Sequence, residues 1–213
     1  MAVLAGETAP PADAEQSSRA EQSPRADLKA AALPESWEPP VASRNWKSIV
    51  LHHSATAQGD VPSIDAAHRR LKDGNGKPWL GIAYHFVIGN GQGMEDGEVQ
   101  PTFRWQRQLQ GAHAGNHLHN EHGIGICLIG NFNQQRPTAK QVAAVKKLVA
   151  ALANRYGIGR SQIVRHLDIQ STECPGRLFP FAEVIAGLNQ GAGLSAGKPG
   201  TKPSTRPFVR RAG

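Results

Sequence analysis

The sequence is short of cysteine and of long apolar runs. Two cysteines in 213 residues exclude a small secreted fold held together by disulfides. The longest apolar runs fall far short of a bilayer span, which excludes a transmembrane protein. Glycine (23) and proline (15) are plentiful but follow no G-x-y period, so the chain is not collagen-like.

The formal net charge of +7 is unevenly distributed along the chain. Residues 1–43 carry a net −4 and are rich in alanine and proline, which predicts a disordered linker. Residues 44–190 carry a net +6 and predict one folded domain of about 145 residues. Residues 191–213 hold five bases and no acid, which predicts a flexible basic tail that is attracted non-specifically to anionic envelope polymers. The core has no helix-turn-helix or RNP-like pattern, so we expect no specific nucleic-acid partner.

Short β-branched runs alternate with amphipathic segments, which predicts an α/β domain with helices on both faces of a sheet. The runs typical of strands lie at 47–53, 83–88, 124–129 and 163–166. Amphipathic periodicity predicts helices at about 60–73, 138–156 and 181–188. Thr138 and Gln141 form the pattern of a capping box, and Gly89-Asn90-Gly91 is typical of a hairpin turn.

A candidate metal site lies toward the end of the domain. His166 ends a predicted strand and Cys174 follows eight residues later, and imidazole with thiolate is a ligand pair that suits zinc. A third ligand must come from elsewhere, and His52 ends another buried strand. Spacing alone is weak evidence, since a core cysteine and surface histidines would give the same pattern.

Five segments in order carry a resemblance to a known family. Together they resemble the zinc-dependent N-acetylmuramoyl-L-alanine amidases of the type 2 amidase family, which includes the bacteriophage T7 lysozyme and the peptidoglycan recognition proteins. The resemblance covers residues 44–188 and implies a central mixed, mostly parallel sheet flanked by helices. The segments are Ile49-Val-Leu-His-His-Ser-Ala-Thr56, Ala83-Tyr-His-Phe-Val-Ile-Gly89, Gly111-Ala-His-Ala-Gly115, Ile124-Gly-Ile-Cys-Leu-Ile-Gly-Asn-Phe132 and His166-Leu-Asp-Ile-Gln-Ser-Thr-Glu-Cys-Pro-Gly176.

The resemblance implies one zinc ion per chain, bound by His52, His166 and Cys174. The adjacent His53 competes for the first position, but neighbours on a strand face opposite ways and the family pattern selects His52. The second-ligand segment often reads His-Arg-Asp in the family, whereas leucine follows the histidine here.

The resemblance also implies roles around the zinc. Tyr84 matches the catalytic tyrosine, Thr172 takes the place of a catalytic lysine in the phage enzymes, and His113 lies in the segment that lines the substrate groove. Trp79 and Trp105 are further candidates for groove walls, although capping the core is an equal interpretation.

The implied reaction is hydrolysis, by zinc-activated water, of the amide between the lactyl group of muramic acid and L-alanine in peptidoglycan. The alternative is a recognition module that binds peptidoglycan without cutting it. This substrate implies a location in the periplasm or at the cell exterior, and we expect the protein to be a monomer. The N-terminus has neither a basic region nor an apolar signal core. Either this is an exported bacterial enzyme whose signal is absent from this chain, which we prefer, or it is a phage enzyme that needs no signal.

Other reactive side chains have less specific interpretations. His117, His119 and His122 are spaced like metal ligands, but we expect them in a loop without a scaffold, which disfavours a second metal site. Cys127 and His85 lie within strands and are expected in the core. The remaining two candidates are His68, expected as a half-buried packing residue, and Glu173, expected to face solvent.

Overall fold

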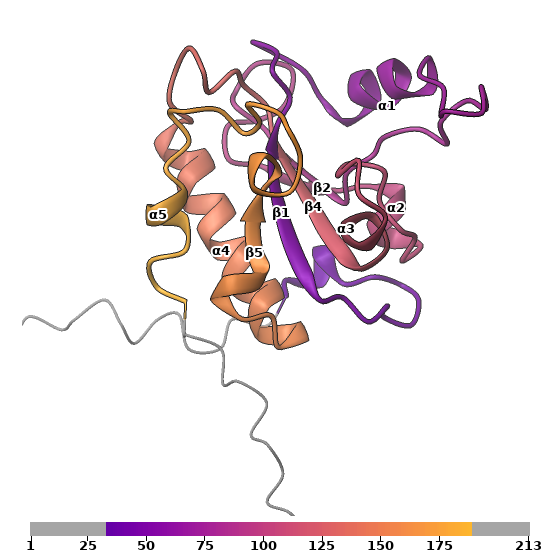
Figure 1. Cartoon of the computed structure of the whole chain (residues 1–213). Coiled ribbons are helices and arrows are strands. Elements are labelled where there is room, and N and C mark those ends of the chain that lie inside the picture. Colours follow the sequence, from indigo (N-terminus) through magenta and orange to yellow (C-terminus); the bar gives the residue numbers. More distant parts are fainter. Residues whose placement is uncertain (1–32, 189–213) are drawn as a thin grey trace, which may run out of the picture.

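A computed structural model describes residues 33–188 and shows an α/β domain built on a five-stranded sheet (Figure 1). The strand order is β3-β2-β4-β1-β5. Strand β1 pairs in parallel with both β4 and β5, β2 is parallel to β4, and only β3 is antiparallel to its neighbour. The predicted mixed, mostly parallel sheet is confirmed. The strands are β1 (Ser48–His53), β2 (Phe86–Ile88), β3 (Val99–Pro101), β4 (Gly123–Leu128) and β5 (Ile163–Arg165).

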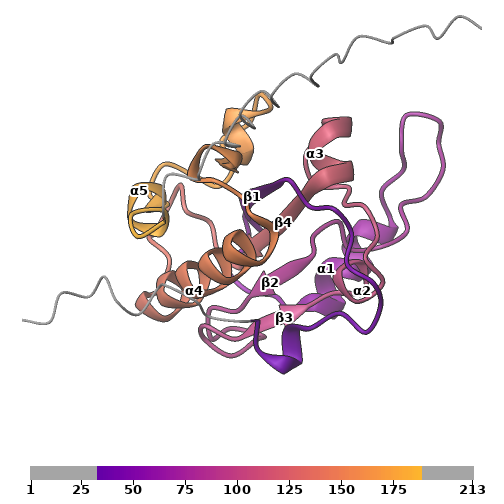
Figure 2. The same ribbon diagram turned by 90° about the horizontal axis from the view of Figure 1, so that it is seen from below.

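Helices cover both faces of this sheet. Helix α4 lies along one face, with α5 beside it, whereas α1, α2 and α3 lie on the other side (Figure 2). The helices are α1 (Val61–Arg69), α2 (Phe103–Gln106), α3 (His117–His122), α4 (Ala139–Tyr156) and α5 (Phe181–Val184). Three 3-10 turns complete the elements: η1 (Glu35–Trp37), η2 (Arg160–Gln162) and η3 (His166–Asp168).

The two faces of β1 have different roles. Ile49 and Leu51 are fully buried in the cluster that packs beneath α4, together with alternate residues of β2 and β4. Because successive side chains of a strand point to opposite faces, His52 lies on the other face, the one covered by α1. Its neighbours in register there are Cys127 on β4 and, beyond it, Val87 on β2. The apolar face therefore holds the core, and the opposite face is free for polar chemistry.

Local capping signals set the starts of the two long helices. Thr138 and Gln141 form the predicted capping box at α4, with reciprocal side-chain bonds of 3.0 and 3.2 Å. Asp60 caps α1, and Ser63 three residues later completes a second box. Asp60 and Ser63 therefore act together at the first turn of α1.

The folded domain begins earlier than the composition predicts. Leu33 and Trp37 are buried in the main core, so the linker prediction is wrong for residues 33–43. Trp105 donates its indole N–H to the Trp37 carbonyl oxygen at 2.6 Å, which ties this segment to α2. Burial of these two large apolar side chains offsets the conformational entropy that is lost when a segment of polar average composition becomes ordered. The rest of the predicted linker and the basic tail lie outside the described residues.

Residues 117–122 form a helix rather than the predicted loop. Asn116 caps α3 by accepting from the backbone N–H groups of Leu118 and His119. A six-residue helix carries too little periodicity to be recognised, and its cap is the only local signal. The hairpin at Gly89 is also longer than predicted, because ten residues (89–98) separate β2 from β3. Within residues 33–188, no helix is long and apolar enough to cross a membrane.

His85 is a fully buried histidine that links β4 to the loop before α3. Its Nδ1 accepts the Gly125 N–H at 2.9 Å, and its Nε2 donates to the Leu109 carbonyl oxygen at 3.0 Å. Burial lowers the pKa of His85 to about 3, so the side chain is neutral in the folded protein. The prediction of a core histidine is confirmed.

We expect His85 to make the metal-free protein sensitive to acid. Its pKa is about 3 in the folded state and about 6.5 in the unfolded state, so the unfolded chain binds one more proton between these values. This contribution to stability is present above pH 6.5 and is lost as the pH falls toward 3. In His85→Gln, which can keep both hydrogen bonds, the free energy of unfolding should depend less steeply on pH, by about 1.4 kcal/mol per pH unit.

Urea unfolding of both proteins at several pH values between 4 and 6 measures this slope. Equal slopes in the two proteins would contradict the assignment of a neutral His85 in the folded state.

Candidate metal centre and adjoining cleft

The candidate metal ligands come together at the carboxyl end of the parallel strands. His52 is the fifth residue of β1, and His166 follows directly after the last residue of the neighbouring β5. Because these strands are parallel and adjacent, their carboxyl ends open at one edge of the sheet, where ligand sites of α/β proteins form. The loop after η3 brings Cys174 back to this edge, where its carbonyl oxygen accepts the Leu167 N–H at 2.8 Å.

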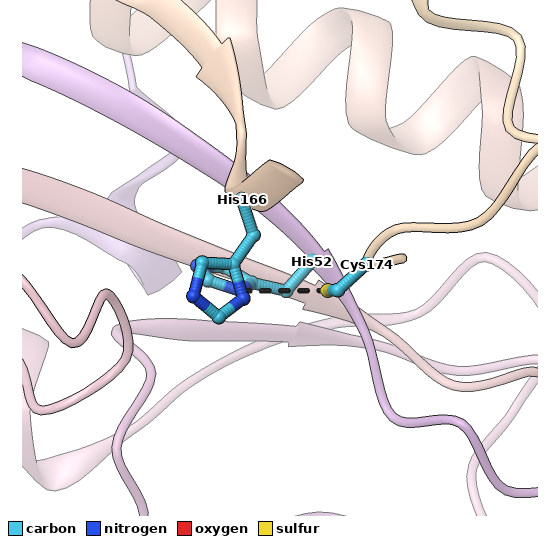
Figure 3. A group of neighbouring side chains, drawn as sticks. All are labelled: His52, His166 and Cys174. Carbon is cyan, nitrogen blue, oxygen red and sulfur yellow. Dashed lines mark hydrogen bonds between the residues drawn. The ribbon is translucent and has the colours of Figure 1, made fainter. Parts of the chain in front are cut away.

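The three side chains converge. One ligand atom from each of His52, His166 and Cys174 lies within 4.8 Å of the other two. The Cys174 sulfur is 3.7 Å from Nδ1 of His52 and also accepts the His53 backbone N–H at 3.4 Å. In Figure 3 the His52 imidazole lies beside that of His166 and faces the sulfur. Two imidazoles and a thiol fit zinc better than Mg²⁺ or Ca²⁺, which prefer oxygen.

A backbone carbonyl determines which nitrogen of His52 is free. Nε2 of His113 donates to the Gly123 carbonyl oxygen at 3.3 Å, so Nδ1 of the neutral His113 ring is an acceptor. That Nδ1 lies 3.0 Å from Nε2 of His52, which must therefore carry the proton. His52 is left with a lone pair on Nδ1, the nitrogen that faces Cys174. Such indirect support is what orients a metal-binding imidazole.

Close backbone approach makes room for His113. Its ring lies over Gly125 of β4, where an added Cβ would come within 2.4 Å of the ring carbon Cδ2. Asn120 of α3 accepts the backbone N–H groups of His113 and Ala114 at 2.8 and 2.9 Å. Helix α3 therefore contributes to the site by holding this loop, not by presenting its own histidines.

Burial keeps His52 and His113 neutral. It lowers the pKa of His52 and that of His113 well below the usual value, and the neighbouring histidines add to the effect. Burial also raises the pKa of the Cys174 thiol to about 11, although the His53 N–H opposes this. Neutral nitrogens are ready to bind a metal ion, whereas the thiol must release its proton when it does.

The competition between the two adjacent histidines is resolved by the strand. His53 points to the α4 face, where its ring packs 5.9 Å from that of Phe132 and its Nδ1 accepts the Phe132 N–H at 3.2 Å. This is the outcome that strand alternation predicts. His53 contributes its backbone N–H to Cys174 and its side chain to the core.

Tyr84 stands beside the three ligands. Its ring centroid lies 5.1 Å from that of His52, and its hydroxyl interacts with the buried thiol of Cys127. Burial raises the pKa of Tyr84 well above its usual value, so the hydroxyl remains a proton donor. Cys127 is fully buried, as predicted, but its position in register with His52 also makes it a neighbour of the site.

A cleft of about 240 Å³ adjoins the site. Its walls are Tyr84, the loop from Ser54 to Gly59, and the exposed side of α1, including His68. Nδ1 of His68 accepts the Ala83 N–H at 3.0 Å, so the neutral ring carries its proton on Nε2. Sequence reasoning places His68 among the packing residues, and the structure adds a place in the cleft wall. No local sequence pattern distinguishes a packing residue from a residue of the cleft wall, because one side of α1 faces the cleft.

The other predicted site residues occupy varied positions. Thr172 is exposed, and its hydroxyl accepts the Cys174 N–H at 3.2 Å, which holds it close to the ligand loop. Glu173 is exposed and accepts from Asn133 at 2.8 Å, in agreement with a solvent-facing role. Trp79 is half-buried against the His68 ring, at 5.6 Å between centroids, near the cleft.

Two groove predictions need correction. Trp105 is fully buried, and its ring packs 4.6 Å from Phe86, so it is a core residue and no groove wall. His113 is only 6% exposed and lies behind His52, so its position supports the ligand rather than the groove surface. Both residues lie in segments that have no clear periodicity, and sequence alone could not assign their sides.

The fold and the site together define an α/β domain with a His-His-Cys group at the carboxyl edge of its sheet. Comparison with protein families places the chain in one class: it belongs to the Amidase_2 family, described as N-acetylmuramoyl-L-alanine amidase, whose model matches residues 42–177. The matched segment contains all three candidate ligands.

Some relatives of this chain are named as amidases and others as peptidoglycan-recognition proteins. The N-acetylmuramoyl-L-alanine amidase LysC from Clostridium intestinale URNW is 32% identical, with a TM-score of 0.57 over 73% of this chain and 93% of that chain. Peptidoglycan-recognition protein SC2 of Drosophila melanogaster is 33% identical over 133 residues, which are 60% of this chain and 66% of the fly protein. The chain therefore spans just under two thirds of the length of such curated relatives.

A more distant structure shares the fold alone. Human PGRP-IBETAC, solved in complex with glycosamyl muramyl pentapeptide, is 21% identical, with a TM-score of 0.50 over 67% of this chain and 84% of that chain.

We expect His113 to support metal binding through His52. In His113→Phe the acceptor for the His52 Nε2–H is lost, and the affinity for Zn²⁺ should fall by about 10- to 100-fold. In His113→Asn the amide oxygen can replace Nδ1, so the loss should be smaller. Competition with a chromophoric chelator measures the dissociation constants. His117→Phe is the control, because the His117 side chain is 88% exposed on α3. Equal affinities in His113→Phe and His117→Phe would refute this role.

Proposed function

We propose that the chain is a zinc-dependent N-acetylmuramoyl-L-alanine amidase that cleaves the amide between the muramic acid lactyl group and L-alanine of peptidoglycan. The observation that carries the proposal is the convergence of His52, His166 and Cys174 within 4.8 Å, beside a cleft, in a chain of the Amidase_2 family. Three protein ligands leave one position of a tetrahedral zinc for water or substrate, as in catalytic rather than structural sites.

The residues present fit a zinc ion with these three ligands. When bound, the ion would supply a Lewis acid for the scissile carbonyl and for the attacking water. The neutral donors around it then have distinct tasks. His52 presents Nδ1 because His113 holds the proton of Nε2, and the two backbone bonds to Cys174 keep its loop against β1. Burial keeps His52 neutral, so its ring can act as a neutral ligand.

Tyr84 is the hydroxyl best placed to stabilise the transition state. As the amide carbonyl is attacked, negative charge develops on its oxygen, and a preorganised donor lowers the energy of that state. Burial keeps the Tyr84 proton in place, and the ring lies between the ligand cluster and the cleft. Thr172 is a second hydroxyl near the ligand loop, although its oxygen is already engaged as an acceptor.

The cleft suits part of an extended polymer. A volume of about 240 Å³ is smaller than a typical pocket for a whole ligand, so it would hold one portion of a muropeptide while the rest lies along the surface. The Nε2–H of His68 and the hydroxyls of Ser54 and Ser63 supply polar contacts there. Because this substrate lies outside the cytoplasmic membrane, the proposed location is the periplasm or the cell exterior.

A non-catalytic recognition module is the second candidate. It is favoured by the curated relatives, which are named for recognition. Release of new amino groups from purified peptidoglycan separates the two candidates. The amidase releases L-alanine amino termini in proportion to time, whereas a module binds the sacculi and releases none.

We expect Cys174 to be essential for zinc. In Cys174→Ala the thiolate ligand is lost, and most of the bound metal should disappear on dialysis, as measured by elemental analysis. Cys127→Ala is the matched control: it removes the other thiol, which interacts with Tyr84 but is not one of the three converging groups, and should keep one zinc per chain. Full zinc occupancy in Cys174→Ala would show that the ligand set is wrong.

We expect Tyr84→Phe to keep zinc and lose turnover. Only the hydroxyl is removed, and one such transition-state donor is worth about 10²- to 10³-fold in rate. Tyr156→Phe is the control, because that hydroxyl lies on α4 and contacts Ser43 instead. Both variants are compared with the parent for zinc content and for amino groups released from a soluble muropeptide. Parental turnover in Tyr84→Phe would rule out the donor role.

A further inference from the structure

A glutamine without an assigned function lies against the second candidate ligand. Gln170 follows η3, four residues after His166, and its Oε1 is 2.7 Å from Nε2 of His166. An amide oxygen can only accept, so the ring must donate from Nε2. In the neutral form of the His166 ring, the lone pair then lies on Nδ1.

This arrangement repeats the one around His52. There the proton on Nε2 is held by His113, and Nδ1 is left free. Both imidazoles are thus held in the same tautomer by a neighbouring acceptor: a histidine nitrogen for His52 and an amide oxygen for His166. In each case the acceptor lies on the side of the ring away from the lone pair.

One loop supports both acceptors. The segment from Gly111 to Gly115 carries His113, and its last residue lies directly under the Gln170 amide. An added Cβ at Gly115 would come within 2.3 Å of Oε1 and 2.6 Å of Cδ of Gln170. Gly115 also has a φ of +57°, a conformation that side chains other than glycine rarely adopt. The absence of a side chain at Gly115 is therefore what lets the Gln170 amide reach His166.

We propose that Gln170 is a positioning residue for zinc, which holds His166 in the tautomer whose Nδ1 is available to the metal ion. The inference rests on the proposed function, because it concerns the zinc of that site. Gln170 itself is exposed, so its replacement leaves the core intact. A surface glutamine with no role would affect neither the tautomer nor the metal.

The test uses the full chain and three variants. Gln170→Leu removes the acceptor with little change in size, and Gln170→Glu retains an oxygen at the same place. Gln135→Leu makes the same change at another exposed glutamine. Zinc dissociation constants come from competition with a chromophoric chelator. The expected result is a 10- to 100-fold weaker affinity in Gln170→Leu, with Gln170→Glu within a few-fold of the parent and Gln135→Leu unchanged.

A second readout follows the tautomer directly. The ring ¹⁵N chemical shifts of His166 in the metal-free protein distinguish a proton on Nε2 from one on Nδ1, with His166→Gln used for assignment. The parent and Gln170→Glu should show the Nε2–H form, and Gln170→Leu a mixture. Equal zinc affinity in Gln170→Leu and the parent, or an Nδ1–H ring in the parent, would overturn the proposal. Absence of zinc binding in the parent would instead overturn the proposed function, and the tautomer measurement would still decide the role of Gln170.

Discussion

The parallel pairing of β1 with β5 is the constraint on which the candidate site depends. Ile49 pairs with Ile163 and Leu51 with Arg165, which brings the residue after β5 to the edge where β1 delivers His52. A one-residue shift of this register would turn His166 to the other face of the sheet. The apolar residues on the α4 face prevent such a shift, because it would also expose them. The burial of Ile49 and Leu51 therefore positions two ligands on the opposite face.

The site is built from neutral groups. His52 and His166 are supported by an imidazole nitrogen and an amide oxygen, where many metal sites use carboxylates. Two neutral imidazoles and one thiolate would leave a bound Zn²⁺ site with a net charge of +1. A positive site with neutral hydroxyl donors nearby suits a reaction in which negative charge develops on a carbonyl oxygen. Burial stabilises this state, because it disfavours protonation of His52 and ionisation of Tyr84.

The loop from Gly111 to Gly115 links the two halves of the site. It supports His52 through His113 and leaves space for Gln170 beside His166. Asn120 anchors this loop from α3, which explains why a short helix rich in histidine lies there without forming a metal site of its own among the described residues. Contacts between segments about 50 to 60 residues apart in the chain therefore hold the side chains of the site in place.

The sequence by itself determined the alternation of strands and helices, the capping box of α4, and the likeness of five segments to one family. It also placed His52 and His53 on opposite faces, because strand alternation is a local rule that needs no tertiary information, and the family likeness selected His52 as the ligand. These features depend on near neighbours in the chain, and near neighbours are what a sequence displays directly.

Only the tertiary structure decided the sides and partners of the remaining residues. Trp105 and Trp37 joined the core through contacts 68 residues apart, and His113 turned behind His52 because Gly125 leaves room there. The Gln170 amide can accept from His166 because Gly115 has no side chain to block it. Whether an aromatic or polar residue faces a groove or the interior depends on which distant segment packs against it, and that is set by the sheet register and the shape of the core, not by the residue's own neighbours.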